Sequence, residues 1–182
     1  RACLRKQLAR QTPFDLDLQI PVDVSVLHPH DAGSGIQRMV RAITQRLQSH
    51  PPPGCKVRTV AASKKRGYRY VNLFSGSACA GEKIEVGSRD VFLGLDLSAH
   101  ILPAHHAQVE RWKREGLTCL FTIYDVLPLQ HPEWFSGRMV RVFRRWMRSV
   151  AILGDGVICI SNGVRADFQS WLLEHYGLEP DD

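Results

Sequence analysis

Short apolar runs alternate with segments of helical periodicity, and this alternation constrains the fold more than any other feature of the sequence. The runs have the length and the branched or aromatic content of buried strands; they cover residues 20–27, 90–98, 117–126 and 156–161. Between them, apolar residues recur three and four positions apart, as in helices that cover a sheet. The pattern predicts an α/β domain with a Rossmann-like parallel sheet and helices on both faces.

The helices are expected over about 36–48, 103–115 and 138–153, and a last one is expected to be capped by Ser161. Two further short strands, at 56–63 and 68–75, flank the basic turn KKRG at 64–67. The ligands of such a sheet bind beyond the carboxyl ends of its strands. This rule directs attention to three places: the loop at 28–35, the segment after Asp96, and the loop that follows Tyr124 and Asp125.

Composition and cysteine content place the chain among ordinary globular proteins. Apolar residues make up 44% of the chain, but no apolar run approaches the roughly 20 residues of a membrane span. The first twelve residues are too polar for a secretory signal. The five cysteines are scattered and form no C-x-x-C pair, which favours a reduced compartment. We therefore expect a cytoplasmic protein.

The net charge is +6, from 24 basic and 18 acidic residues, and favours acidic partners. Part of this charge lies in RMVRVFRRWMR at 138–148, where arginines alternate with an apolar side. That side is expected to contain Met139, Val142 and the following Val150, with Phe143, Trp146 and Met147 as further candidates. A packed helix with a solvated basic face is the simpler interpretation. The alternative is peripheral docking to anionic lipid at the inner face of a membrane.

The loop HPHDAGSG at 28–35 has the properties of a phosphate-binding turn. Gly33 and Gly35 permit close approach of a backbone, and the helix that follows offers N–H groups and a positive dipole end. Arg38 adds a full charge one turn later. A purely structural turn with a solvated Arg38 is the alternative, because the G-x-G-x-x-G fingerprint is incomplete and a Walker lysine is absent.

The segment TIYDVLPLQHPEWF at 122–135 is the second candidate. Tyr124 and Asp125 stand where a strand ends, so their side chains are expected to reach the ligand crevice. The alternative is that Asp125 caps a turn while Trp134 and Phe135 bury the loop. No carboxylate or cysteine stands at a recognised ligand spacing around the histidines, so we expect no metal.

Taken together, three segments resemble the family 4 glycosyltransferases. DVSVLHPHDAGSGIQRMVRAI is similar to that family's D-x-S strand, glycine loop and helix, and Gly35-Ile36-Gln37-Arg38 matches its G-(I/V)-x-R pattern. TIYDVLPLQHPEWF is similar to T-x-H-D-x-x-P-x-x-x-P-E, and GVICISNGVRADFQSWL to a strand ending in S-x-x-S/V-x-x-D. The matches occur in order over about residues 20–173. Within that family, the matched segments most resemble bacterial enzymes that build O-antigen and capsular chains, often with mannose.

The resemblance implies a GT-B enzyme, in which two Rossmann-like domains face a cleft and a sugar is transferred with retention of configuration and without a metal. This chain matches only the N-terminal, acceptor-side domain. The resemblance implies a lead-in at 1–19, the domain at 20–176 and the start of an interdomain linker at 177–182. The donor implied is a nucleotide-diphosphate sugar, such as GDP-mannose, shared with a C-terminal domain. The acceptor implied is a growing polysaccharide or lipid-linked glycan.

The resemblance, together with the rule on the carboxyl ends of the strands, assigns three groups of residues. The catalytic group is Gly35, Tyr124 and Asp125; the donor diphosphate is held by Gly33, Ser34, Gly35 and Arg38; the acceptor is met by Asp96 and His131. Tyr124 departs from the family, which commonly has histidine there, and a tyrosine does not titrate near neutral pH.

We expect this chain to fold but not to catalyse without its C-terminal domain. Two alternatives stay open: another nucleotide-cofactor enzyme, and a basic module that binds a membrane surface or nucleic acid. No aromatic-rich strand of the RNA-binding type is visible in the sequence, so nucleic acid is not expected as a partner.

Overall fold

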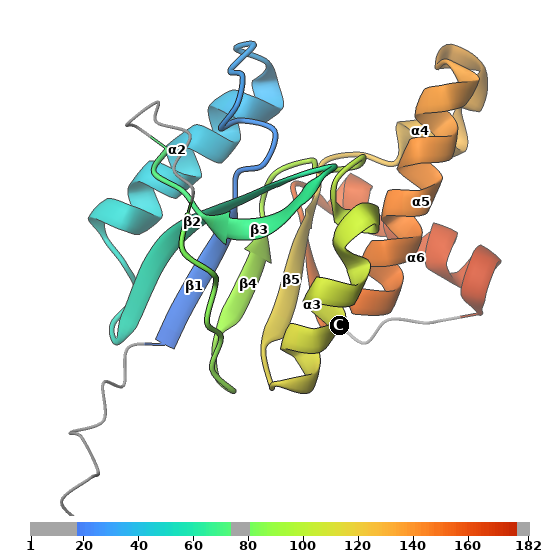
Figure 1. Ribbon diagram of the computed structural model, residues 1–182. Helices are drawn as coiled ribbons and strands as arrows, with labels where there is room; N and C mark the ends of the chain where they lie inside the picture. Colours follow the sequence, from blue (N-terminus) through green and yellow to red (C-terminus); the bar gives the residue numbers. More distant parts are fainter. Residues whose placement is uncertain (1–17, 74–80, 178–182) are drawn as a thin grey trace, which may run out of the picture.

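A computed structural model describes residues 18–73 and 81–177, and its centre is a six-stranded sheet (Figure 1). In spatial order the strands are β3-β2-β1-β4-β5-β6, and all neighbours are parallel except the antiparallel pair β2 and β3. The strands are β1 (Leu18–Asp23), β2 (Cys55–Ser63), β3 (Arg66–Tyr70), β4 (Val91–Gly94), β5 (Thr118–Ile123) and β6 (Gly156–Cys159). The expected lead-in lies outside the described residues except for 18–19, and the expected linker except for Gly177.

Helices cover both faces of this sheet, which confirms the predicted fold class. The α-helices are α2 (Gly35–Ser49), α3 (His106–Arg114), α4 (Leu127–Gln130), α5 (Gly137–Leu153) and α6 (Asn162–Tyr176), and the 3-10 helices are η1 (Leu102–His105) and η2 (Pro132–Trp134). Phe92 and Leu93 are neighbours in β4 and so point to opposite faces. Phe92 joins the core formed with α3, α5 and α6, while Leu93 packs against the core formed with α2.

Two strands end earlier than the sequence predicts. The apolar run at 20–27 leaves the sheet after Asp23, and the run at 90–98 leaves it after Gly94. The cause is the pair of aspartates inside these runs. Asp96 accepts hydrogen bonds from the backbone N–H groups of Val26 (2.7 Å) and Leu27 (2.8 Å), which turns the chain away from the sheet.

The segment 127–134, expected as an ordered loop, contains α4 and η2. The β2–β3 hairpin turns at Lys64 and Lys65 alone, because Arg66 already belongs to β3. In α5 the predicted apolar side is confirmed for Phe143, Trp146, Met147 and Val150, which are buried, but not for Met139, which is 54% exposed. These differences are local and leave the order of the elements as predicted.

The strand order reverses at β1, which has β2 on one side and β4 on the other. In doubly wound sheets such a switch point opens a crevice at the carboxyl ends of the strands, where ligands bind. The loop from β1 to α2 and the loop after β4 leave the sheet at this crevice.

Candidate functional site

Two buried aspartates lie at the switch point: Asp23 is the last residue of β1, and Asp96 follows β4. Asp23 is 1% exposed and Asp96 2% exposed. Asp23 Oδ1 accepts hydrogen bonds from the backbone N–H and the hydroxyl of Ser25, and Asp23 Oδ2 accepts one from the Tyr68 hydroxyl at 3.2 Å. Ser25 Oγ in turn accepts the N–H of Ala62 at 2.8 Å. This network joins the ends of β1, β2 and β3.

The burial of these carboxyl groups changes their titration. Burial, and then the negative charge of Asp96, raise the pKa of Asp23 to about 7. Burial also raises the pKa of Asp96, although hydrogen bonds from Leu27 and Val26 oppose that shift. Asp96 Oδ1 is buried and has no hydrogen-bond partner among residues 18–73 and 81–177. Asp96, expected to meet the acceptor, therefore lies beneath the surface and anchors the β1–α2 loop.

The β1–α2 loop is ordered by a capping box. Ser34 caps α2 by accepting the N–H of Gln37, and the Gln37 side chain accepts the N–H of Ser34. Gln37 also accepts from Ala32 N–H and donates to the His30 carbonyl, both within 3.0 Å. The loop conformation is thus fixed from inside the chain, before any ligand is present.

The residues expected at the donor diphosphate meet at this helix start. Gly33 has a φ of +67°, which an L-residue rarely adopts, and a Cβ added at Gly33 or Gly35 would meet nothing within 4 Å. The N–H groups of Gly35 and Ile36 donate to no other group in the described part of the chain. Arg38 is exposed one turn further on. Open space, two available N–H donors and a nearby cation are what an anion needs at a helix N-terminus.

Tyr124 is placed differently from the expectation that its side chain reaches the crevice. It is 6% exposed, and its hydroxyl donates to the Leu95 carbonyl at 2.6 Å. Burial raises the pKa of Tyr124 further above its ordinary value, so it stays protonated. Asp125 is partly exposed, and its Oδ1 accepts the N–H of Leu127 at 3.2 Å, which is the turn-capping contact of the alternative interpretation.

His131, expected at the acceptor, lies between α4 and η2. Its ring stacks on Trp134, with ring centroids 4.0 Å apart and planes inclined by 10°. Its Nδ1 is 3.3 Å from Glu133 Oε1. Trp134 is 64% exposed, so the idea that it buries the loop is wrong. The stacked pair is an exposed aromatic surface beside the start of α5.

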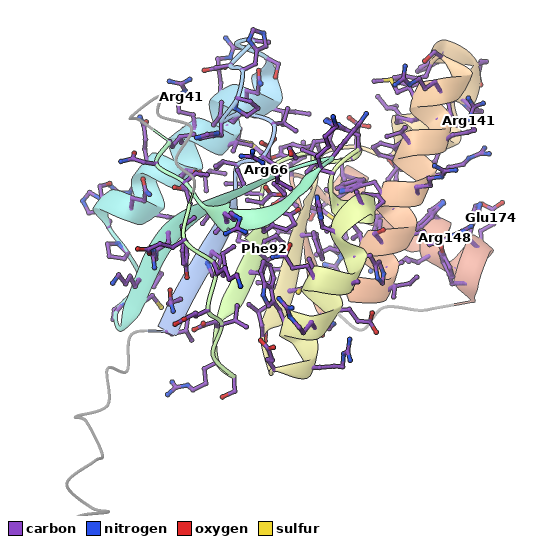
Figure 2. The ribbon with its side chains drawn as sticks, viewed as in Figure 1. Arg41, Arg66, Phe92, Arg141, Arg148 and Glu174 are labelled. Carbon is purple, nitrogen blue, oxygen red and sulfur yellow. The ribbon has the colours of Figure 1, made fainter. Side chains whose placement is uncertain are left out.

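Sequence reasoning missed a cavity of about 740 Å³ between the β2–β3 hairpin and the end of β1. Its lining includes three basic side chains, Lys65, Arg66 and Arg69, with Ser25 and His28. The basic turn KKRG was the available signal, but its meaning depends on a partner surface nearly 40 residues earlier in the chain. Figure 2 shows Arg66 on the hairpin, over the middle of the sheet.

The basic residues of α5 lie on one exposed side. They are Arg138, Arg141, Arg144, Arg145 and Arg148. None of them forms an ion pair within residues 18–73 and 81–177. Arg141 and Arg148 project from the outer side of α5, away from the sheet (Figure 2).

Among the residues that the structure describes, no three histidine, cysteine or acidic side chains are grouped so that they could hold a metal ion. In the same residues no helix is both long enough and apolar enough to cross a bilayer.

Comparison with known proteins gives one consistent result. No protein-family model matches the chain. Three curated proteins, each called serotype-specific mannosyltransferase WbdA and each from Escherichia coli, are 35% identical to it over 159 residues. The match covers 85% of this chain but only 19–20% of each relative. The sequence-based resemblance to bacterial mannosyltransferases is thereby confirmed: this chain is similar to about one fifth of such an enzyme.

Proposed function

We propose that this chain is the N-terminal, acceptor-side domain of a retaining GT-B glycosyltransferase of family 4. It takes part in moving a hexose, mannose, from a nucleotide-diphosphate sugar such as GDP-mannose to a growing polysaccharide or lipid-linked glycan. The observation that carries the proposal is the 35% identity over 159 residues to mannosyltransferases. The α/β fold and the open helix start at the switch point support it.

In this mechanism the start of α2 stabilises the departing diphosphate. Negative charge grows on the leaving group as the glycosidic bond breaks, so preorganised donors lower the barrier without moving a proton. The N–H groups of Gly35 and Ile36 are such donors, and the capping box of Ser34 and Gln37 holds them in place. Arg38 contributes a charge to the same region, and no metal is invoked.

A valine at Gly35 tests this role in the full-length enzyme. A Cβ at this position meets nothing within 4 Å, so the variant is expected to fold normally. The isopropyl group would occupy the space of the diphosphate and lower sugar transfer by about 100-fold or more, the range found when an oxyanion donor is lost. Gly137→Val is the matched control, because Gly137 also follows a serine N-cap and has only the Arg141 side chain nearby. Normal transfer by Gly35→Val would remove the α2 start from the mechanism.

The chain alone is expected to be inactive, because the groups that hold the nucleoside belong to the C-terminal domain that the resemblance implies. The assay is transfer of labelled mannose from GDP-mannose by residues 1–182 and, in parallel, by the full-length protein. Transfer by the 182-residue chain would contradict this part of the proposal.

The arginines of α5 support a second part: peripheral contact with the anionic inner face of the cytoplasmic membrane, where a lipid-linked acceptor resides. Each basic residue near such a surface contributes about 1 kcal/mol. Replacing Arg141 and Arg148 by glutamine should reduce sedimentation with phosphatidylglycerol vesicles strongly, and more so at low salt. Glutamines at Arg111 and Arg114 of α3 provide the control. Equal loss in both variants would indicate non-specific charge attraction.

A further inference from the structure

The charged side chains that line the cavity beneath the β2–β3 hairpin are all basic, whereas two buried aspartates lie elsewhere at the switch point. Its described lining contains Lys65, Arg66 and Arg69, and no acidic side chain. Asp23, which is hydrogen-bonded to the lining residue Ser25, is buried and is not part of the lining. A concave surface of one sign concentrates ions of the opposite sign.

The basic side chains at this cavity are available to a ligand. Neither Lys65 nor Arg66 makes an ion pair or a side-chain hydrogen bond within residues 18–73 and 81–177, and both are exposed. Arg69 donates one hydrogen bond, to the Gly81 carbonyl at 3.2 Å, and keeps its remaining N–H donors. Three basic side chains therefore line the cavity, and no acidic side chain of the described residues neutralises them.

One residue of the cavity lining also has an unsatisfied polar atom. His28 belongs to the lining, and its Nε2 is buried without a hydrogen-bond partner in the described chain. Native structures satisfy most buried polar atoms, so an orphaned ring nitrogen beside a basic hollow indicates a missing partner. The Ser25 hydroxyl, by contrast, already donates its proton to Asp23 and accepts one hydrogen bond from Ala62.

We propose that this cavity binds a phosphate or diphosphate group, with Lys65, Arg66 and Arg69 as its cationic ligands. A volume of about 740 Å³ holds such a group together with the moiety attached to it. Arginine and lysine around one hollow suit phosphate oxygens, since charge-assisted hydrogen bonds are the strongest that side chains form. The site is separate from the α2 start, where backbone N–H groups supply the donors.

The charge and shape of the cavity support anion binding by themselves. The source of the anion rests on the proposed function, since a transferase has two substrates that carry phosphate: the nucleotide-sugar donor, and a phosphorylated glycan or lipid-linked acceptor. The two sources share the same chemistry at the cavity and differ only in what is attached to it.

Calorimetric titration of the 182-residue chain with inorganic pyrophosphate tests the site. The double variant Lys65→Gln with Arg66→Gln should weaken binding by about tenfold or more, because hydrogen bonds to charged groups are lost. The control is Arg144→Gln with Arg145→Gln, which removes the same charge from α5 and should change the affinity by less than about twofold if only general attraction is lost. All four side chains are exposed, and circular dichroism would verify that both variants fold.

The same variants assign the source. A larger loss for GDP than for geranyl diphosphate, a soluble analogue of a lipid-linked acceptor, identifies the donor, and the reverse identifies the acceptor; either result supports the site. Absence of saturable pyrophosphate binding, or equal weakening in the α5 control, would overturn it. These measurements need no sugar transfer, so a failure of the proposed function and a failure of the anion site are told apart.

Discussion

Replacing Asp23 by asparagine should make the stability of this protein less dependent on pH. The substitution keeps the size of the side chain, and the amide oxygen can still accept the hydrogen bonds of Ser25. It removes the ability to ionise at a fully buried position. The quantity that should change with pH is the difference in the free energy of unfolding between wild type and variant.

The direction and size of this pH dependence follow from the pKa of Asp23, which is 3.8 in an unfolded chain and about 7 in the native state. Between these values the native state holds a proton that the unfolded chain has released. The contribution of Asp23 to the free energy of unfolding is therefore fully present below pH 3.8, and it is lost as the pH rises through about 7. One pKa unit corresponds to about 1.36 kcal/mol, so the loss between pH 5.5 and 8.5 is about 2 kcal/mol.

Urea denaturation at pH 5.5 and 8.5 measures the effect. The free energy of unfolding of Asp23→Asn, relative to wild type, should rise by about 2 kcal/mol between the two values. Titrating groups that do not interact with Asp23, such as His100, whose pKa is lowered by burial, are present in both proteins and cancel to first order. Glu110→Gln on the exposed side of α3 is the control and should show no such change. A difference that stays constant, or falls, would refute the burial of a protonatable Asp23.

Gly33→Ala and Gly35→Ala isolate the effect of backbone conformation, since an added Cβ has open space at both positions but φ is positive only at Gly33. Gly33→Ala should lower the free energy of unfolding by about 1–2 kcal/mol and Gly35→Ala should not, which thermal or urea unfolding can measure; equal effects would contradict the left-handed turn. Cys119 should react with a thiol reagent far more slowly than Cys55, because burial raises the pKa of the Cys119 thiol to about 12 and keeps it 0% exposed. Comparable labelling rates in single-cysteine variants would show that β5 is not buried.

The order of strands and helices could be predicted from the sequence because it depends on local periodicity. The ends of β1 and β4 could not, since Asp23 and Asp96 look like polar positions within apolar runs. Their effect comes from contacts across about 70 residues, such as Asp96 with Val26 and Leu27.

The candidate site divides in the same way. Ser34, Gly35 and Arg38 are adjacent in sequence, so a strand–turn–helix pattern placed them together at the start of α2. The inward orientation of Tyr124 depends on the Leu95 carbonyl, and the basic cavity depends on the hairpin folding over the end of β1. Neither contact can be read from local sequence, although the basic turn KKRG marks the hairpin as a charged segment. Contacts between segments that are distant in the sequence therefore could not be predicted from it.

The two edge strands of the sheet, β3 and β6, differ in how readily another strand could pair with them. At β3 the outer edge carries Arg66 and Arg69, and Arg69 is bridged to Lys83, so charge and a covering segment discourage another strand from pairing there. At β6 the edge is apolar, with Val157 37% and Ile158 46% exposed. In concentrated solution, self-association of the isolated chain should therefore begin at β6, and a charged substitution at Ile158 is the change expected to improve its solubility.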